Sequence, residues 1–105
     1  MTDAHEPVEL SRNTFVPHVG TSFHVQAGTA TVELTLAIVT EPRASPRAEA
    51  FSLEFRGPTS AALPQGEYPF RHADIGEFTL FIVPVGQVGA ELEYEAVFNR
   101  VLPTP

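Results

Sequence analysis

The sequence has 105 residues, of which 43% are hydrophobic and 18% charged, as expected for one folded domain. Six positive and 13 negative side chains give a formal net charge of −7, which argues against nucleic acid and anionic membranes as partners, because their phosphates would be repelled. Cysteine is absent, so disulfides, thiolate catalysis and cysteine-based zinc sites are excluded.

The first residues are polar and predict a flexible N-terminal tail over residues 1–9, followed by a single β-domain over residues 10–102. The start of the chain has neither the basic nor the apolar segment of a secretory signal. No apolar run approaches the length of about 20 residues that a membrane-spanning helix needs. We therefore expect a cytoplasmic protein.

The segment LSRNTFVPHVG predicts one short N-terminal helix. Ser11 is a suitable N-cap, and Phe15 and Val19 have the i, i+4 spacing that places two side chains on one helical face. Pro17 removes a backbone donor, so only one or two turns are expected. Gly20 is placed to end the helix.

After this helix, apolar and polar residues alternate with a period of two, which is typical of strands with one buried face. Six segments show the pattern: 22–26, 30–40, 51–56, 67–71, 77–86 and 91–99. The residues expected in the core are Leu34, Leu36, Leu53, Phe55, Phe78, Leu80, Ile82, Tyr94 and Phe98.

Glycines separate these segments, and no helical pattern lies between them, so neighbouring strands are expected to pair antiparallel. The prediction is an all-β fold: a small six-stranded antiparallel barrel or a tight sandwich with one short helix. Residues 41–49 are expected to form a longer polar connection. Pro69 cannot donate to a ladder, which predicts an edge or a bulge at that point.

Several motifs resemble an uncharacterised bacterial domain family. They are FSLEFRGP, LPQGEYPFRHADIGEFTLFIVPVG and YEAVFN, with LSRNTFVPHVG as the lead-in, and the resemblance runs from about Leu10 to Asn99. It implies a small, mostly β domain of unknown function, sometimes encoded near phage-tail-collar-like proteins, and hence an assembly or interaction role. It implies no catalytic residues, because none is assigned in the family.

The four histidines are the candidates for metal ligation or acid–base chemistry. His72 precedes Asp74 in an H-x-D pair, but no HExxH or comparable ligand spacing occurs. A turn that Asp74 caps is the more ordinary explanation. We expect no metal and no cofactor, and a hydrolase built on His72 and Asp74 is the least favoured hypothesis. No G-x-S-x-G motif or phosphate-cradling glycine loop is present.

The stretch EFTLFIVPVG is apolar on both faces of its strand. Phe81, Val83 and Val85 extend the second face, and Val39 and Val97 add to it on two other strands. We expect the short helix to cover Phe81 and Val83, and the apolar margin around it to form a candidate partner surface.

The favoured function is a non-enzymatic β-domain that acts through contacts with a protein partner or a second copy of itself, as an accessory or assembly component of a phage-tail-like system. The alternative is a small-molecule or carbohydrate-binding barrel whose mouth holds Tyr68, His72 and Tyr94. Glu91, Glu93 and Glu95 form an outward acidic row, with which arginines on neighbouring strands can pair.

Overall fold

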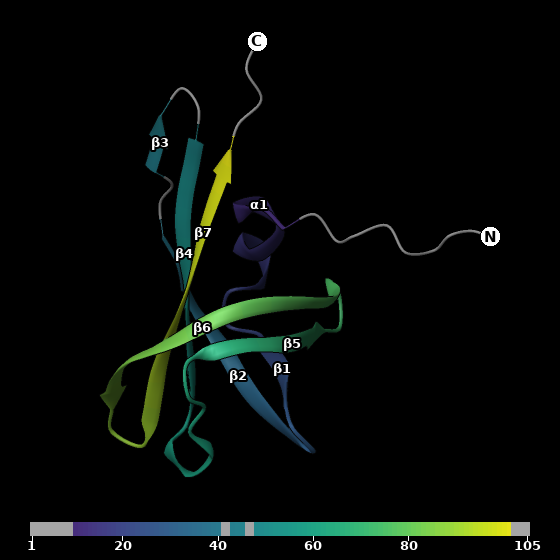
Figure 1. Cartoon of the computed structure of the whole chain (residues 1–105), viewed down its shortest axis with the longest axis vertical. Coiled ribbons are helices and arrows are strands. Elements are labelled where there is room, and N and C mark those ends of the chain that lie inside the picture. The colour runs from purple at the N-terminus through teal and green to yellow at the C-terminus, as the bar shows by residue number, and fades with distance from the viewer. Residues whose placement is uncertain (1–9, 41–42, 46–47, 102–105) are drawn as a thin grey trace, which may run out of the picture.

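The structure is a computed structural model that describes residues 10–40, 43–45 and 48–101. The predicted tail over residues 1–9 lies outside the described residues. A short helical segment precedes seven strands (Figure 1). The elements are α1 (Arg12–Phe15), the 3-10 turn η1 (Val16–His18), β1 (Ser22–Ala27), β2 (Ala30–Val39), β3 (Arg43–Ser45), β4 (Ala48–Pro58), the 3-10 turn η2 (Thr59–Ala61), β5 (Gly66–His72), β6 (Gly76–Val88) and β7 (Glu91–Val101).

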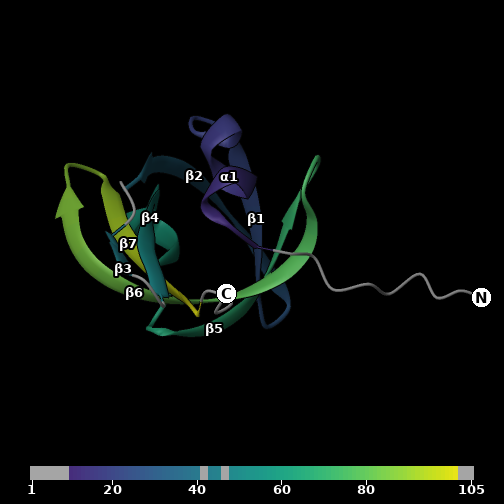
Figure 2. The ribbon, with the colours of Figure 1, turned by 90° about the horizontal axis from the view of Figure 1, so that it is seen from above.

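Six of the strands form a closed antiparallel barrel, which confirms the all-β prediction. Their order is β2-β1-β5-β6-β7-β4, and the pairing of β2 with β4 closes the ring. Seen from above, the ribbon surrounds a central space (Figure 2). Side chains of one face of every strand fill that space, since alternate residues of a strand point to opposite faces.

The seventh strand, β3, lies within residues 41–49, where only a connection was expected. It pairs with the first residues of β4, from Arg43 opposite Ala50 to Ser45 opposite Ala48. Three residues are too few to show a period of two, so the sequence pattern could not reveal this strand.

The barrel interior is built from aliphatic and aromatic side chains. Seven of the nine residues expected in the core are buried: Leu34, Leu36, Leu53, Phe55, Leu80, Ile82 and Tyr94. Phe78 and Phe98 are partly buried and pack against this core. The β6–β7 ladder runs only from Val83 opposite Glu95 to Val88 opposite Glu91, so Phe78 and Phe98 lie beyond it. There the two strands diverge (Figure 1).

The helix closes this diverging end, and it does so with one side chain. Phe15 is 0% exposed and packs its ring 5.8 Å from that of Phe78 and 5.6 Å from that of Phe98. The prediction that Val19 shares the face of Phe15 is wrong, because the α-helical turn ends at Phe15 and Val19 is 46% exposed. Gly20, with φ of 89°, turns the chain into β1. No helix of the described ranges is long and apolar enough to cross a membrane.

A bulge in β2 changes which residues face the core. The register of β2 with β4 shifts between Leu36 and Ile38. Ile38 is therefore 42% exposed, while Val39 is partly buried against the core. The assignment of Val39 to the outer apolar surface is wrong for this reason, since one inserted residue reverses the alternation.

Pro69 lies in a strand that has neighbours on both sides. The β1–β5 ladder, however, covers only His24 opposite Arg71 and Val25 opposite Phe70. Pro69 itself pairs only with Thr79 of β6. Its missing N–H therefore falls where β5 is locally an edge, in agreement with the prediction.

Candidate functional site

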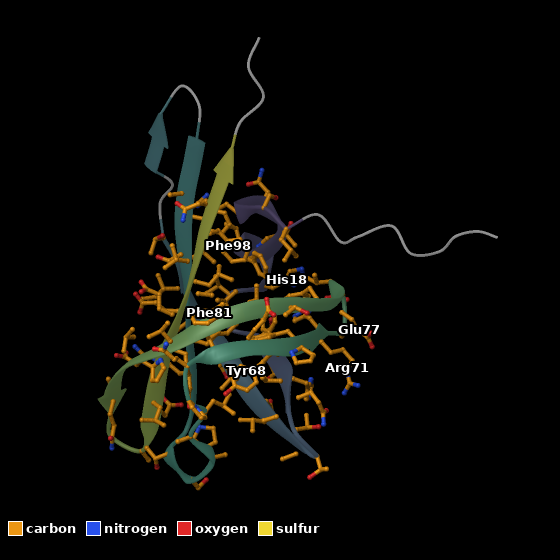
Figure 3. The ribbon with its side chains drawn as sticks, viewed as in Figure 1. His18, Tyr68, Arg71, Glu77, Phe81 and Phe98 are labelled. Carbon is orange, nitrogen blue, oxygen red and sulfur yellow. The ribbon has the colours of Figure 1, made fainter. Side chains whose placement is uncertain are left out.

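Large apolar side chains are exposed on the outer side of β6 and β7. Phe81 and Val85 are each 53% exposed, and Val97 is 62% exposed. Phe81 lies on β6 where this strand crosses β7 (Figure 3). The expected helical lid over Phe81 is wrong, because the helix instead inserts Phe15 into the barrel interior on the opposite face of the sheet. Val83 is half-buried.

Two carboxylates lie among these apolar groups. The ladders align four outward residues across four strands: Ile38 of β2 is opposite Glu54 of β4, Glu54 is opposite Glu95 of β7, and Glu95 is opposite Val83 of β6. Both glutamates are half-buried. We call this surface the outer patch; its residues are Ile38, Glu54, Phe81, Val83, Val85, Glu95 and Val97.

The charges of the outer patch are not balanced within the described part of the chain. The neighbouring Arg56 forms an ion pair with Glu93, with 3.4 Å between Nη2 and Oε2, as cross-strand pairing predicted. Neither Glu54 nor Glu95 has an ion pair within the described residues. Like charges directly opposite each other on two strands are in general destabilising.

Ile38 and Glu54 were not predicted from the sequence as parts of this surface. The bulge hides the outward direction of Ile38, and Glu54 meets Glu95 only because β4 pairs with β7 across a long separation in sequence. The alternation within β4 shows that Glu54 points outward, but it does not show which strand lies beside it.

The ring of His72 is buried and has hydrogen-bond partners at both nitrogens. Its Nδ1 accepts the backbone N–H of Asp74 at 3.0 Å and that of Ile75 at 3.3 Å. Nδ1 therefore carries no proton, and Nε2–H donates to Oγ1 of Thr21 at 2.9 Å. Thr21 in turn donates to the carbonyl of His18 at 2.6 Å. His72 thus caps the β5–β6 turn, a role that we had assigned to Asp74.

Burial lowers the pKa of His72 below its ordinary value, and the nearby His18 lowers it further, against a smaller opposing effect of Asp74. The two imidazole rings are 4.5 Å apart between centroids, and the ring of Phe23 lies 4.4 Å from His72 on another side. These surroundings favour the neutral ring, which the hydrogen bonds at Nδ1 also require.

His18, His72 and Asp74 come close enough together for one metal ion to be considered, with ligand atoms within 4.8 Å of one another. The hydrogen bonds make His72 a poor ligand. A neutral imidazole has one free lone pair, and here that lone pair, on Nδ1, accepts two backbone N–H groups. Coordination through either nitrogen would break this capping arrangement.

The predicted ligand mouth is not formed by its three residues. Tyr94 is 0% exposed, and its hydroxyl accepts the backbone N–H of Leu63 at 2.9 Å. The hydroxyl of Tyr68 donates to the carbonyl of Pro64 at 2.7 Å. Both tyrosines therefore hold the loop between β4 and β5, whereas His72 caps the turn at the far end of β5.

A groove of about 410 Å³ lies elsewhere on the barrel, where the β1–β2 and β5–β6 hairpins separate. Its lining residues are His24, Gln26, Thr31, Pro69, Phe70, Arg71, Glu77, Phe78 and Thr79. Arg71 and Glu77 are opposite each other in the β5–β6 ladder, near the end of that hairpin (Figure 3).

The ring of six paired strands defines the class of the fold: a small antiparallel β-barrel domain. The sequence matches, over residues 10–98, the family described as domain of unknown function (DUF6916), and the chain belongs to this family. Neither a curated protein nor a solved structure matches the chain.

Proposed function

We propose that the protein is a non-enzymatic β-barrel domain that binds another protein through the outer patch. The observation that carries the proposal is the exposure of Phe81, Val85 and Val97 on one side of the barrel. Single exposed apolar side chains are ordinary, but several that neighbouring strands bring together mark a contact surface. β6 and β7 supply these three, and β2 adds Ile38 by register.

The roles of the buried titratable side chains in the described part of the chain support the non-enzymatic part of the proposal. His72 is the one buried titratable side chain besides Tyr94 among the described residues, and both serve backbone groups. Neither has a free proton-transferring atom directed at an open pocket, which general acid–base catalysis requires.

A different protein fits the patch better than a second copy of this chain does. In a two-fold dimer the same patch meets itself, so Glu54 and Glu95 of one protomer would approach those of the other. The resulting repulsion of carboxylates would oppose association. The formal net charge of −7 acts in the same direction.

The test places a photo-crosslinking residue, p-benzoylphenylalanine, at Phe81 and, as a control, at the exposed Thr29 in the turn between β1 and β2. Irradiation in the native host should join one defined protein to position 81 and not to position 29. The identified protein, once purified, should bind a Phe81→Thr variant at least about tenfold more weakly than the parent. Equal labelling at both positions, or equal affinity of parent and variant, would show that the patch is not the interface.

The resemblance to a family sometimes encoded near phage-tail-collar-like proteins suggests where the partner belongs. An accessory or assembly component of a phage-tail-like system is the form of protein contact that we propose. The test is whether the protein cross-linked at position 81 is encoded beside this chain and belongs to a tail structure.

The groove between the two hairpins supports a second candidate function, the binding of a small molecule. It offers a guanidinium at Arg71 and a carboxylate at Glu77 beside the phenyl ring of Phe78. A thermal-shift screen of sugars and amino acids tests it. A ligand that stabilises the parent, but not an Arg71→Ala variant, would favour this function over the first.

A further inference from the structure

We infer that the partner inserts an arginine side chain, flanked by aliphatic side chains, between Glu54 and Glu95. This inference rests on the proposed function and specifies the chemistry of the partner. It comes from one juxtaposition: two half-buried carboxylates directly opposite each other, with apolar side chains at both ends of their row.

The arrangement brings two like charges onto neighbouring strands of the free protein. Directly opposite residues of an antiparallel pair have Cβ atoms about 4.5–5.5 Å apart, at which distance two negative charges repel. The partial burial of Glu54 and Glu95 reduces the screening by water. Arg56 and Glu93 lie two residues away from Glu54 and Glu95 on the same two strands, and they form an ion pair with each other. The guanidinium of Arg56 is therefore already engaged by another carboxylate.

A cation between the two carboxylates would relieve the repulsion, because it replaces one repulsive interaction with two attractive interactions. Arginine suits the position because its planar group has five N–H donors and can address two carboxylates at once, whereas the ammonium of lysine is a compact, strongly hydrated charge. Ile38 and Val83, at the two ends of the row, match aliphatic neighbours of that arginine.

The charges of the outer patch fit a protein partner better than a membrane or a nucleic acid. An anionic membrane or a nucleic acid would present phosphates to these carboxylates, and both would be repelled. A protein segment with alternating aliphatic residues around an arginine satisfies the apolar and the charged parts of the outer patch together.

The first experiment needs no partner. Glu95→Gln should raise Tm by about 2–5 °C at low salt, because a repulsive cross-strand pair is removed. Glu91→Gln is the matched control: it changes the net charge equally, but Glu91 is exposed and lies opposite the uncharged Pro58 and Val88. The excess of the first shift over the second should shrink in 1 M NaCl, where interactions between exposed charges more than about 3 Å apart are largely screened. Equal shifts for the two variants would overturn the inference.

The second experiment uses two nine-residue peptides of alternating valine and threonine that differ only at the central residue, arginine or glutamate. In titrations of isotope-labelled protein, the arginine peptide should shift the amide signals of Glu54, Val83 and Glu95 and bind at least about tenfold more tightly than the glutamate peptide. The preference should disappear in Glu54→Gln/Glu95→Gln.

Equal binding of the two peptides, or binding of neither, overturns the inference about arginine. The proposed function is judged separately, by the cross-linking at position 81. A specific cross-link without any preference for arginine would therefore leave the interface in place and remove only its charge selectivity.

Discussion

The hydroxyl of Tyr94, in the barrel core, accepts the backbone N–H of Leu63 at 2.9 Å and so holds the β4–β5 loop to β7. Both groups are buried, and Tyr94→Phe would leave the N–H of Leu63 without an acceptor. We expect this variant to lose about 1–3 kcal/mol of unfolding free energy, the cost of an unsatisfied buried donor. Chemical denaturation of parent and variant measures the loss.

Tyr68→Phe is the matched control, because its hydroxyl bonds to the carbonyl of Pro64 in an exposed position. Water can replace that bond, so the control should change stability by less than about 0.5 kcal/mol. Similar losses in both variants would mean that the buried hydrogen bond of Tyr94 contributes no more to the unfolding free energy than the exposed one of Tyr68.

The sequence pattern predicted the positions of the strands well, but it predicted only in part which residues of neighbouring strands meet. A period of two identifies which residues share a face of one strand, which is why Leu34, Phe55 and Ile82 were correctly placed in the core. It cannot foresee an inserted residue such as the bulge beside Ile38, which turned Val39 inward.

The candidate site was predictable to a similar extent. Phe81, Val85 and Val97 could be named from their strands, and they are exposed. The helix was wrongly expected to cover Phe81 and Val83, because a segment's periodicity does not say which face of a sheet it meets. The role of His72 depends on Thr21, which lies 51 residues away in the sequence and beside it only in the folded barrel.

His72 should make stability depend on pH. Burial lowers its pKa in the folded state below the ordinary value of 6.5, so between these two values the unfolded chain binds more protons. The contribution of His72 is therefore present above pH 6.5 and is lost as the pH falls from 6.5 towards the lowered pKa. Denaturation at pH 7.5 and at pH values stepping down from 6.5 should show this loss of stability.

His72→Asn separates this effect from the other groups nearby, which are His18, His24 and Asp74. The side-chain oxygen of asparagine can accept the N–H groups of Asp74 and Ile75 as Nδ1 does, but it does not titrate. The variant should lose less stability between pH 7.5 and pH 5.5 than the parent does. An unchanged pH dependence would assign the effect to other residues.

Zinc should not stabilise the protein. The lone pair on Nδ1 of His72 is engaged by two backbone N–H groups, which leaves the exposed Asp74 and the half-buried His18 as a weak pair of ligands. A specific site at 100 times its dissociation constant would add about 2.7 kcal/mol, which a melting curve detects readily. We expect melting curves with zinc and with a chelator to coincide; a clear separation would refute the assignment of His72 as a turn cap.

Gly57 of β4 lies beside Leu34 of β2 in the interior. A Cβ at this position would overlap Cδ2 of the fully buried Leu34, with the ring of Tyr94 at 3.7 Å on another side. Gly57→Ala should therefore cost about 1–3 kcal/mol through overpacking. Gly66→Ala is the control, since its Cβ would meet the ring of Tyr68 at an ordinary 3.7 Å, and it should be neutral or stabilising by about 0.4–1 kcal/mol.

The two phenylalanines Phe15 and Phe81 should respond in opposite ways in stability and in binding. Phe15 is 0% exposed and joins the rings of Phe78 and Phe98, so Phe15→Ala should cost about 3–5 kcal/mol through the cavity it leaves. Phe81 is 53% exposed, and threonine suits a strand, so Phe81→Thr should cost less than about 1 kcal/mol.

Binding should show the reverse order, because Phe81 belongs to the outer patch and Phe15 does not. Phe81→Thr should keep the melting curve of the parent and lose affinity for the protein cross-linked at position 81. Phe15→Leu, which keeps most of the buried volume, should lower Tm and leave that affinity intact in the folded fraction. If Phe81→Thr instead unfolds the protein, the side chain stabilises the barrel itself, and its exposure would not mark an interface.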